Sequence, residues 1–235
     1  MSTEALTLRP AQPEDLAAVA DLHLRARRHA VPVMPPPVHE DDAVLRHVGG
    51  WDLGAREVWL AEDGSGALRG YAALVGDWLE DLYVDPAAQR TGVGSALLEV
   101  VCSLRPDGVC LWVFETNLPA RAFYAAAGFV ELERTDGSAN EERCPDLRLA
   151  WPGHDPLAFL RGLIDDVDVE LGDLLARRAA LTAAVQTVKP RTHRDPDRER
   201  AVARAVAARV PALDPRDVAR IMDAVIGASL AASRI

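Results

Sequence analysis

The sequence predicts an α+β domain, built on a mixed sheet flanked by helices, followed by an all-α domain of three helices. Strand-like segments, glycine turns and every Trp and Tyr lie before residue 152. The later residues are dominated by Ala, Leu, Val, Arg and Asp and lack the alternation of a strand. A chain of 235 residues is long enough for two domains. The change in composition therefore predicts one domain over residues 1–152 and another over residues 153–235.

Apolar runs and turn residues predict the elements of the first domain. Expected strands cover residues 5–9, 58–62, 67–75, 78–84 and 109–114. Expected helices cover residues 13–29 and 95–104, and a further helix begins at Asn117. A Pro-rich loop, residues 31–38, is expected to lie over a substrate.

A glycine loop, QRTGVG at residues 89–94, follows one strand and opens the helix that starts at Ser95. Glycines let the backbone approach phosphate oxygens closely, and the free N–H groups of a helix start attract negative charge. Arg90 adds a cation for the same purpose. An ordinary glycine turn has the same pattern, so the loop alone is a weak indication. The strand and helix that follow, with Asn117 and Tyr124, favour a phosphate site.

Charge is divided unevenly along the chain. Residues 1–150 contain 13 Arg and 24 Asp or Glu, whereas residues 151–235 contain 13 Lys or Arg and 12 Asp or Glu. Because nucleic-acid binding needs clustered basic side chains, the acidic first domain argues against a nucleic-acid partner. It favours a cationic acceptor instead.

Cysteine and histidine positions give no metal pattern. Cys102, Cys110 and Cys144 lack CxxC spacing, and their odd number argues against a disulfide framework. The histidines at positions 23, 29, 39 and 47 show no HxxxH pairing, so no metal site is expected. No apolar run approaches about 18 residues and the start is not signal-like, which favours a cytoplasmic protein without membrane contact.

The stretches LYVDPAAQRTGVGSALL and NLPARAFYAAAGF resemble the GNAT acetyltransferase family, and the resemblance covers nearly the whole first domain. It implies acetyl-CoA as co-substrate and an amine acceptor that the sequence does not identify. The residues that it implies for binding acetyl-CoA come from a strand end, the glycine loop and the next helix start: Leu82, Tyr83, Val84, Gln89, Arg90, Thr91, Gly92, Val93, Gly94, Ser95 and Asn117.

Tyr124 matches the tyrosine that this family places near the CoA sulfur, where it is the candidate acid for protonating the leaving thiolate. The alternative is a core aromatic residue with a hydrogen-bonded hydroxyl, since Phe123 and Phe129 flank it. Glu80 and Glu115, each near a strand end, are the candidate bases. Removal of the amine proton through water is the alternative to both.

The second domain begins with a helix expected over residues 156–188. Its apolar positions alternate in spacings of four and three, which defines a heptad seam: Leu160, Ile164, Val167, Leu171, Leu174, Arg178, Leu181, Val185 and Val188. The seam is expected to be packed along its whole length. A guanidinium within it needs an anionic partner, from protein or ligand, because it cannot lose its charge. Asp195-Pro196 and Asp214-Pro215 are expected to start two further helices.

Spacing along the long helix defines a candidate anion site. Arg178 and Lys189, the one lysine of the chain, are 11 residues apart and face the same side. Arg161 lies 17 residues before Arg178 and cannot reach the same ligand on a straight helix, so a second subunit would supply it. Glu199 is expected to point at the packed seam. A purely structural ion network is the alternative to a ligand site.

The stretches LRGLIDDVDVELGDLLARRAALTAAVQTVK and RDPDRERAVARAV resemble the all-helical chorismate mutases, over residues 156–233. The resemblance implies a homodimer through the long helix and conversion of chorismate to prephenate, in aromatic amino acid biosynthesis, without a cofactor. Arg161 then resembles the arginine donated by the partner subunit, and Arg178 and Lys189 resemble the carboxylate and ether-oxygen contacts. The residues that resemble the group around the ring hydroxyl and a third-helix hydroxyl are Asp195, Arg198, Glu199 and Ser229.

Ser233 departs from this family, which carries Gln or Glu there as a second donor to the ether oxygen. A serine hydroxyl reaches less far, and loss of one such donor costs about 100-fold or more in rate. The prediction is a bifunctional acetyltransferase and mutase. Two alternatives stay open: a helical domain that acts on isochorismate or an amino analogue of chorismate, and a non-catalytic dimerising or sensing module that regulates the acetyltransferase.

Overall fold

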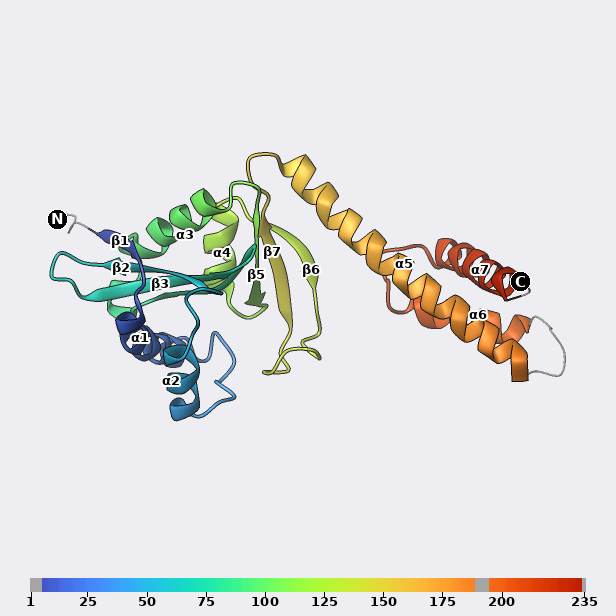
Figure 1. Ribbon diagram of the computed structural model, residues 1–235, viewed down its shortest axis with the longest axis horizontal. Helices are drawn as coiled ribbons and strands as arrows, with labels where there is room; N and C mark the ends of the chain where they lie inside the picture. Colours follow the sequence, from blue (N-terminus) through green and yellow to red (C-terminus); the bar gives the residue numbers. More distant parts are fainter. Residues whose placement is uncertain (1–5, 189–194, 234–235) are drawn as a thin grey trace. The chain divides into compact units, whose positions relative to one another are not determined.

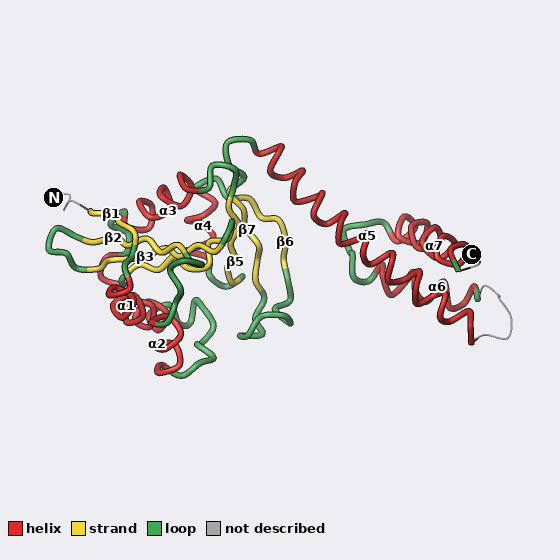
Figure 2. Tube along the Cα trace, in the orientation of Figure 1, coloured by secondary structure: helices red, strands yellow, loops and turns green. Residues whose placement is uncertain are grey.

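The computed structural model describes residues 6–188 and 195–233. They form two compact units, divided between Leu160 and Arg161. Within the described residues all strands belong to the first unit, whereas the second is built from helices (Figure 2). The prediction of a mixed sheet with helices, followed by three C-terminal helices, is confirmed. None of the helices in the described ranges is long and apolar enough to cross a membrane.

The described part of the first unit contains one sheet of seven strands, in the order β1-β2-β3-β4-β5-β7-β6. The strands are β1 (Thr7–Pro10), β2 (Glu57–Glu62), β3 (Leu68–Val75), β4 (Trp78–Val84), β5 (Val109–Phe114), β6 (Val130–Arg134) and β7 (Asp146–Trp151). Among the strands in the described ranges, only β4 and β5 pair in parallel. A parallel pair needs a crossover connection, and here the crossover carries the glycine loop and helix α3 (Val93–Leu104).

Helices cover both faces of this sheet (Figure 1). One face carries α1 (Leu16–His29) and α2 (Asp41–Gly49), and the other carries α3 and α4 (Leu118–Ala126). Two short 3-10 helices are Pro13–Asp15 and Pro86–Ala88. Along β3, Tyr71 and Ala73 join the core with α1, whereas Ala72 and Leu74 join the core with α3. This period of two is what a strand buried on both faces requires.

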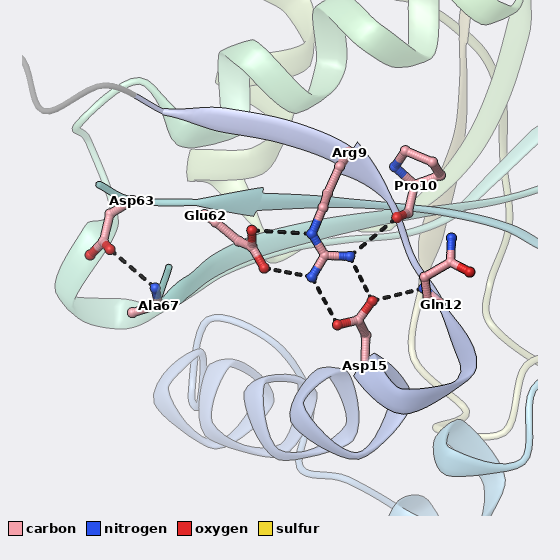
Figure 3. Close-up of polar contacts among 7 residues, drawn as sticks. All are labelled: Arg9, Pro10, Gln12, Asp15, Glu62, Asp63 and Ala67. Atoms are coloured by element: carbon pink, nitrogen blue, oxygen red, sulfur yellow. Dashed lines mark hydrogen bonds and ion pairs between the residues drawn. The ribbon is translucent and has the colours of Figure 1, made fainter. Parts of the chain in front are cut away.

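Arg9 ties the edge strand β1 to its neighbours (Figure 3). Its guanidinium donates to the carboxylate of Glu62 on β2 at 2.6 Å and to that of Asp15 at 2.7 Å. The hydrogen bond from Arg9 holds the pKa of Asp15 below its usual value. Asp15 also accepts the backbone N–H of Gln12 at 2.7 Å. The cluster therefore holds the start of α1 against the sheet edge.

The sequence pattern did not predict α2 or β7. Helix α2 is only nine residues long, which is shorter than the stretch over which helical periodicity can be judged. Strand β7 lies between β5 and β6 and pairs with both, although it follows them in the chain. Neither helix α2 nor the pairing of β7 can be predicted from a short stretch of sequence.

The three C-terminal helices are α5 (Pro156–Val188), α6 (Pro196–Ala207) and α7 (Pro215–Ala232). The predicted Asp-Pro starts are confirmed. The Asp195 carboxylate accepts the backbone N–H groups of Asp197 and Arg198, and the Asp214 carboxylate accepts that of Arg216. Each carboxylate satisfies N–H groups that have no partner inside the helix.

Helix α5 presents two stripes of different character. A partly buried stripe contains small and polar residues, namely Arg178, Ala179, Thr182, Ala183 and Gln186. The heptad seam is instead open, with exposed fractions from 45% to 81% at Ile164, Val167, Leu171, Leu174, Leu181, Val185 and Val188. The expectation that the seam is packed along its whole length is therefore wrong for the single chain. Two shorter helices are too small to cover both stripes of a 33-residue helix.

Candidate active sites

Strands β4 and β5 pair at one position and then separate. Trp78 pairs with Cys110, and the rings of Trp78 and Trp112 stack with their centroids 6.3 Å apart. A cavity of about 610 Å³, here called the central cavity, is lined by residues 79–83 of β4 and 111–114 of β5. The separation of the two strands thus makes room for a ligand within the sheet.

A second cavity, of about 500 Å³, lies at the glycine loop. Nine of the eleven residues predicted for acetyl-CoA line it: Leu82, Tyr83, Val84, Gln89, Arg90, Gly92, Gly94, Ser95 and Asn117. The other two lie elsewhere, since Val93 is buried in the core and the Thr91 hydroxyl donates to the Ala88 carbonyl at 2.7 Å. Val33 and Met34, from the Pro-rich loop, also line this cavity.

The backbone of the glycine loop suits an anion. Gly92 directly precedes α3 and has a φ of 98°, and Arg90 has a φ of 62°. A Cβ at Gly92 would meet no atom within 4 Å, so the glycine is needed for its positive φ and not for space. The first N–H groups of α3 have no partner within the helix. With the Arg90 guanidinium, they fit the pyrophosphate of acetyl-CoA.

Tyr124 lines both cavities and marks the place where they meet. Its side chain is buried, and its ring centroid lies 5.1 Å from that of Phe123 and 5.2 Å from that of Phe129. Burial raises the pKa of the Tyr124 hydroxyl well above its usual value. The hydroxyl is therefore protonated at neutral pH and can donate a hydrogen bond at this junction. Asn117, at the same junction, caps α4 by accepting the N–H of Ala120 at 3.2 Å.

Asp81 is the largely buried carboxyl of β4 at the central cavity, and it was not predicted from the sequence. It lies 3.4 Å from Nη1 of Arg56 and 3.9 Å from Nδ1 of His23. Burial raises the pKa of Asp81 to about 7 and lowers that of His23 to about 4. The available signal was a pair of consecutive acids in an apolar strand, since one of two strand neighbours must face inward.

The two predicted bases have different surroundings. Glu80 lines the central cavity, although it is exposed. Glu115 follows β5, forms an ion pair with Arg134 and does not line the central cavity. Of the carboxyls on β4 and at the end of β5, Glu80 and Asp81 are therefore the ones in reach of a ligand there.

Carboxylates outnumber cationic groups among the charged side chains that line the central cavity. The described lining residues include five acids, which are Glu80, Asp81, Glu133, Glu142 and Asp146, and one guanidinium, that of Arg27. Arg27 donates to Glu142 at 2.7 Å and to the Pro35 carbonyl at 2.8 Å, which joins two loops beside the cavity. The cavity is thus suited to a cationic group.

A third cavity, of about 270 Å³, lies among the C-terminal helices. Four predicted residues line it: Arg178, Asp195, Arg198 and Glu199. Arg178 donates from Nη1 to Oγ of Ser229 at 2.6 Å and to the Val225 carbonyl at 3.3 Å. Ser229 is buried, so it orients the Arg178 guanidinium from behind the cavity.

Of the other predicted residues that the structure describes, Arg161 and Ser233 do not line this cavity. Arg161 is exposed on α5, and the Ser233 hydroxyl donates to the Leu230 carbonyl at 2.8 Å. Lys189 lies outside the described residues. Thr182 and Gln186 line the cavity but were not predicted. Thr182 lies four residues and Gln186 eight residues after Arg178, about one and two helical turns, and this spacing was the signal that could have found them.

Comparison with known proteins finds a family match in each part of the chain. Residues 54–131 match the family model of the acetyltransferase (GNAT) domain, and residues 160–234 match that of chorismate mutase type II. The peptidyl-lysine N-acetyltransferase YiaC of Escherichia coli strain K12 is 31% identical over 154 residues, which span 62% of this chain and 96% of YiaC. The chain belongs to the GNAT acetyltransferases. It also carries a chorismate mutase type II domain.

Other relatives match the GNAT domain. The mycothiol acetyltransferase of Brachybacterium faecium is 42% identical over 67 residues, which span 28% of this chain and 20% of that protein. The apo form of YjaB from Escherichia coli has a TM-score of 0.53 at 23% identity, covering 63% of this chain and 99% of YjaB. YncA from Salmonella typhimurium with its cofactor acetyl-CoA has a TM-score of 0.51 at 22% identity, covering 64% and 95%. These two structures support the GNAT fold.

Proposed function

We propose that the chain is a bifunctional enzyme. Residues 1–152 transfer the acetyl group of acetyl-CoA to a primary amine, and residues 153–235 convert chorismate to prephenate. The observation that carries the first activity is the meeting of two cavities at Tyr124. One contains a glycine loop and a helix start suited to acetyl-CoA, and the other is lined by carboxylates suited to a cationic amine.

Two side chains divide the proton transfers of acetylation. When bound, acetyl-CoA supplies the acetyl group as a thioester. Asp81 takes the proton that the amine nitrogen loses as nitrogen bonds to the acetyl carbon, and its pKa of about 7 suits a base at neutral pH. Tyr124 gives its hydroxyl proton to the sulfur as the C–S bond breaks, and solvent returns a proton to Tyr124. The products are an amide and a free thiol.

The proposed acceptor is the side-chain amine of a lysine in a peptide or protein. The relative YiaC is named a peptidyl-lysine N-acetyltransferase, and the acidic central cavity attracts an ammonium group. Release of CoA with lysine-containing peptides, compared with a small free amine, tests this choice. Tyr124→Phe is expected to lower kcat by about 100-fold. If the protein binds acetyl-CoA but acetylates neither kind of amine, this acceptor class is wrong.

The helical domain is proposed to hold chorismate as a dianion. Arg178 and Arg198 line the cavity, and Ser229 supports the orientation of Arg178. In the rearrangement a C–O bond breaks while a C–C bond forms within one molecule, so no side chain has to exchange a proton. The residues contribute by restraining the reactive conformation and by placing positive charge near the oxygen of the breaking bond.

Dimerisation through α5 is proposed to complete this site. The open heptad seam is an apolar surface of the kind that marks protein interfaces. Arg161 lies 17 residues, or about 25 Å along the helix, from Arg178, so it cannot reach the cavity of its own chain. In a symmetric dimer each chain would give its Arg161 to the other.

Chorismate consumption, with the product identified by mass, tests the second activity. The unsubstituted protein is expected to form prephenate, and Arg178→Ala is expected to lose at least about 100-fold in kcat/KM. Loss of pyruvate from the substrate would indicate the isochorismate-type alternative. Binding of chorismate without turnover would favour the sensing module, and acetyl transfer would then be compared with and without chorismate.

A further inference from the structure

Gln186 places an amide in the cavity of the helical domain. It lies two turns after Arg178 on α5 and lines the same cavity as Arg178 and Arg198. Its Oε1 atom is buried and has no hydrogen-bond partner in the part of the chain that the structure describes. The carbonyl end of the amide is thus covered by protein, and no hydrogen bond within the described residues uses its N–H end.

This arrangement costs folding free energy, because a buried carbonyl oxygen loses its bonds to water and gains none. A methionine would have a similar length and would avoid that cost. Thr182, which lies one turn earlier and lines the same cavity, has a hydrogen-bond partner for its polar group, because its hydroxyl donates to the Arg178 carbonyl at 2.9 Å. The amide of Gln186 therefore needs another explanation than packing.

No other uncharged side chain in the described lining of this cavity is free to donate a hydrogen bond to a ligand. Thr182 and Gln186 are the uncharged polar residues among its described lining, and the hydroxyl of Thr182 is already used. Ser233, the residue expected to donate from the third helix, gives its hydrogen bond to Leu230 instead and does not line the cavity. Arg178 and Arg198 favour an anionic ligand, whose oxygens can accept further N–H groups.

We propose that Gln186 contacts the bound substrate and donates an amide N–H to one of its oxygens, in place of the donor that Ser233 does not supply. This inference rests on the proposed mutase function. The Gln186 amide then binds the substrate together with Arg178 and Arg198. It also explains why an amide is kept at a position where it destabilises the free protein.

Three variants of the full-length protein test the proposal with chorismate. Gln186→Met is expected to lower kcat/KM by about 10-fold to 100-fold and to leave the melting temperature equal or higher, because the unpartnered oxygen is removed. Gln186→Glu is expected to be weak at alkaline pH and to recover as the pH falls, because a protonated carboxyl can donate again. Thr187→Val is the matched control, because Thr187 lies next to Gln186 on α5, is exposed and does not line the cavity, and it should keep wild-type kcat/KM and pH profile.

The outcomes separate this proposal from the mutase assignment. If the wild-type protein turns over chorismate, unchanged kcat/KM in Gln186→Met with an unchanged pH profile in Gln186→Glu overturns the role of Gln186. If chorismate binds without turnover, calorimetry replaces the kinetics, and equal affinity of wild type and Gln186→Met overturns it. If chorismate does not bind at all, the proposed mutase function fails and this inference fails with it.

Discussion

Burial of the Asp81 carboxyl lowers the stability of the folded domain once the carboxyl is charged. The same burial shifts its pKa into the range that suits acid–base chemistry. The pKa of this carboxyl rises to about 7 because burial disfavours its charged form, even with Arg56 3.4 Å away. In an unfolded chain an aspartate has a pKa of about 3.9, so the folded chain binds this proton more tightly than the unfolded chain does. The stability of the domain should therefore fall as the pH rises from about 4 to about 7.

Asp81→Asn is expected to stabilise the protein at alkaline pH. Asparagine cannot ionise, so the variant avoids the cost of a buried charge, whereas at about pH 4 wild type carries the neutral acid and gains nothing from the change. Urea denaturation at about pH 8 should give a higher midpoint for Asp81→Asn than for wild type, and at about pH 4 the two midpoints should agree. A lower midpoint at both pH values would contradict the raised pKa.

Acetyl transfer is expected to depend on the same carboxyl. The wild-type rate should rise with pH through about 7 as Asp81 loses its proton, and Asp81→Asn should lose about 100-fold or more together with this rise. Initial rates of CoA release across the pH range measure both effects. Glu115→Gln is the matched control, because Glu115 pairs with Arg134 and does not line the central cavity. Normal activity in Asp81→Asn would leave Glu80 or water as the base.

At the scale of elements, the turn into α3 contains two residues with positive φ, Arg90 and Gly92. Gly92 and Gly66 are a matched pair, with φ values of 98° and 80° and no atom within 4 Å of an added Cβ. Alanine at either position should lower the free energy of unfolding by about 1–2 kcal/mol. Only Gly92→Ala should also raise the KM for acetyl-CoA, by about tenfold, because Gly92 lines that cavity. Thermal melts and steady-state kinetics check the pair, and equal KM values would contradict the assigned binding site.

Helix α5 shows how two periodicities can share one element. The Leu and Val positions of the heptad seam gave the stronger sequence signal, yet they are exposed in the single chain. The stripe that is partly buried contains Ala, Thr and Gln and gave no such signal. The position and the start of the helix follow from the sequence, whereas the face that packs inside the chain does not.

At the scale of the whole molecule, subunit complementation tests the proposed dimer. Arg161→Ala and Arg178→Ala are each expected to abolish mutase activity. In a mixed dimer, one of the two cavities receives an intact Arg178 from one chain and an intact Arg161 from the other. Unfolding and refolding the two variants together should therefore restore about a quarter of the wild-type activity. No recovery in a sample shown to be dimeric would mean that Arg161 acts within its own chain or not at all.

Local features of this protein were determined by its sequence. The glycine loop before α3, the Asp-Pro starts of α6 and α7 and the start of α5 depend on backbone preferences and hydrogen bonds over a few residues. The same motifs carried both family resemblances. Residues whose roles come from such motifs, such as Gly92 and Arg178, could therefore be named without a structure.

The tertiary structure alone decided which of two neighbouring acids is buried, where β7 pairs, and which stripe of α5 faces the other helices. Asp81 gains its raised pKa from burial by segments that lie far away in the chain, which outweighs the lowering effect of Arg56, and Gln186 lines its cavity together with residues of α6 and α7. Burial and pairing depend on segments that meet only when the chain is folded. Short-range sequence patterns carry no information about contacts between distant segments, which is the physical reason that these residues were not predicted.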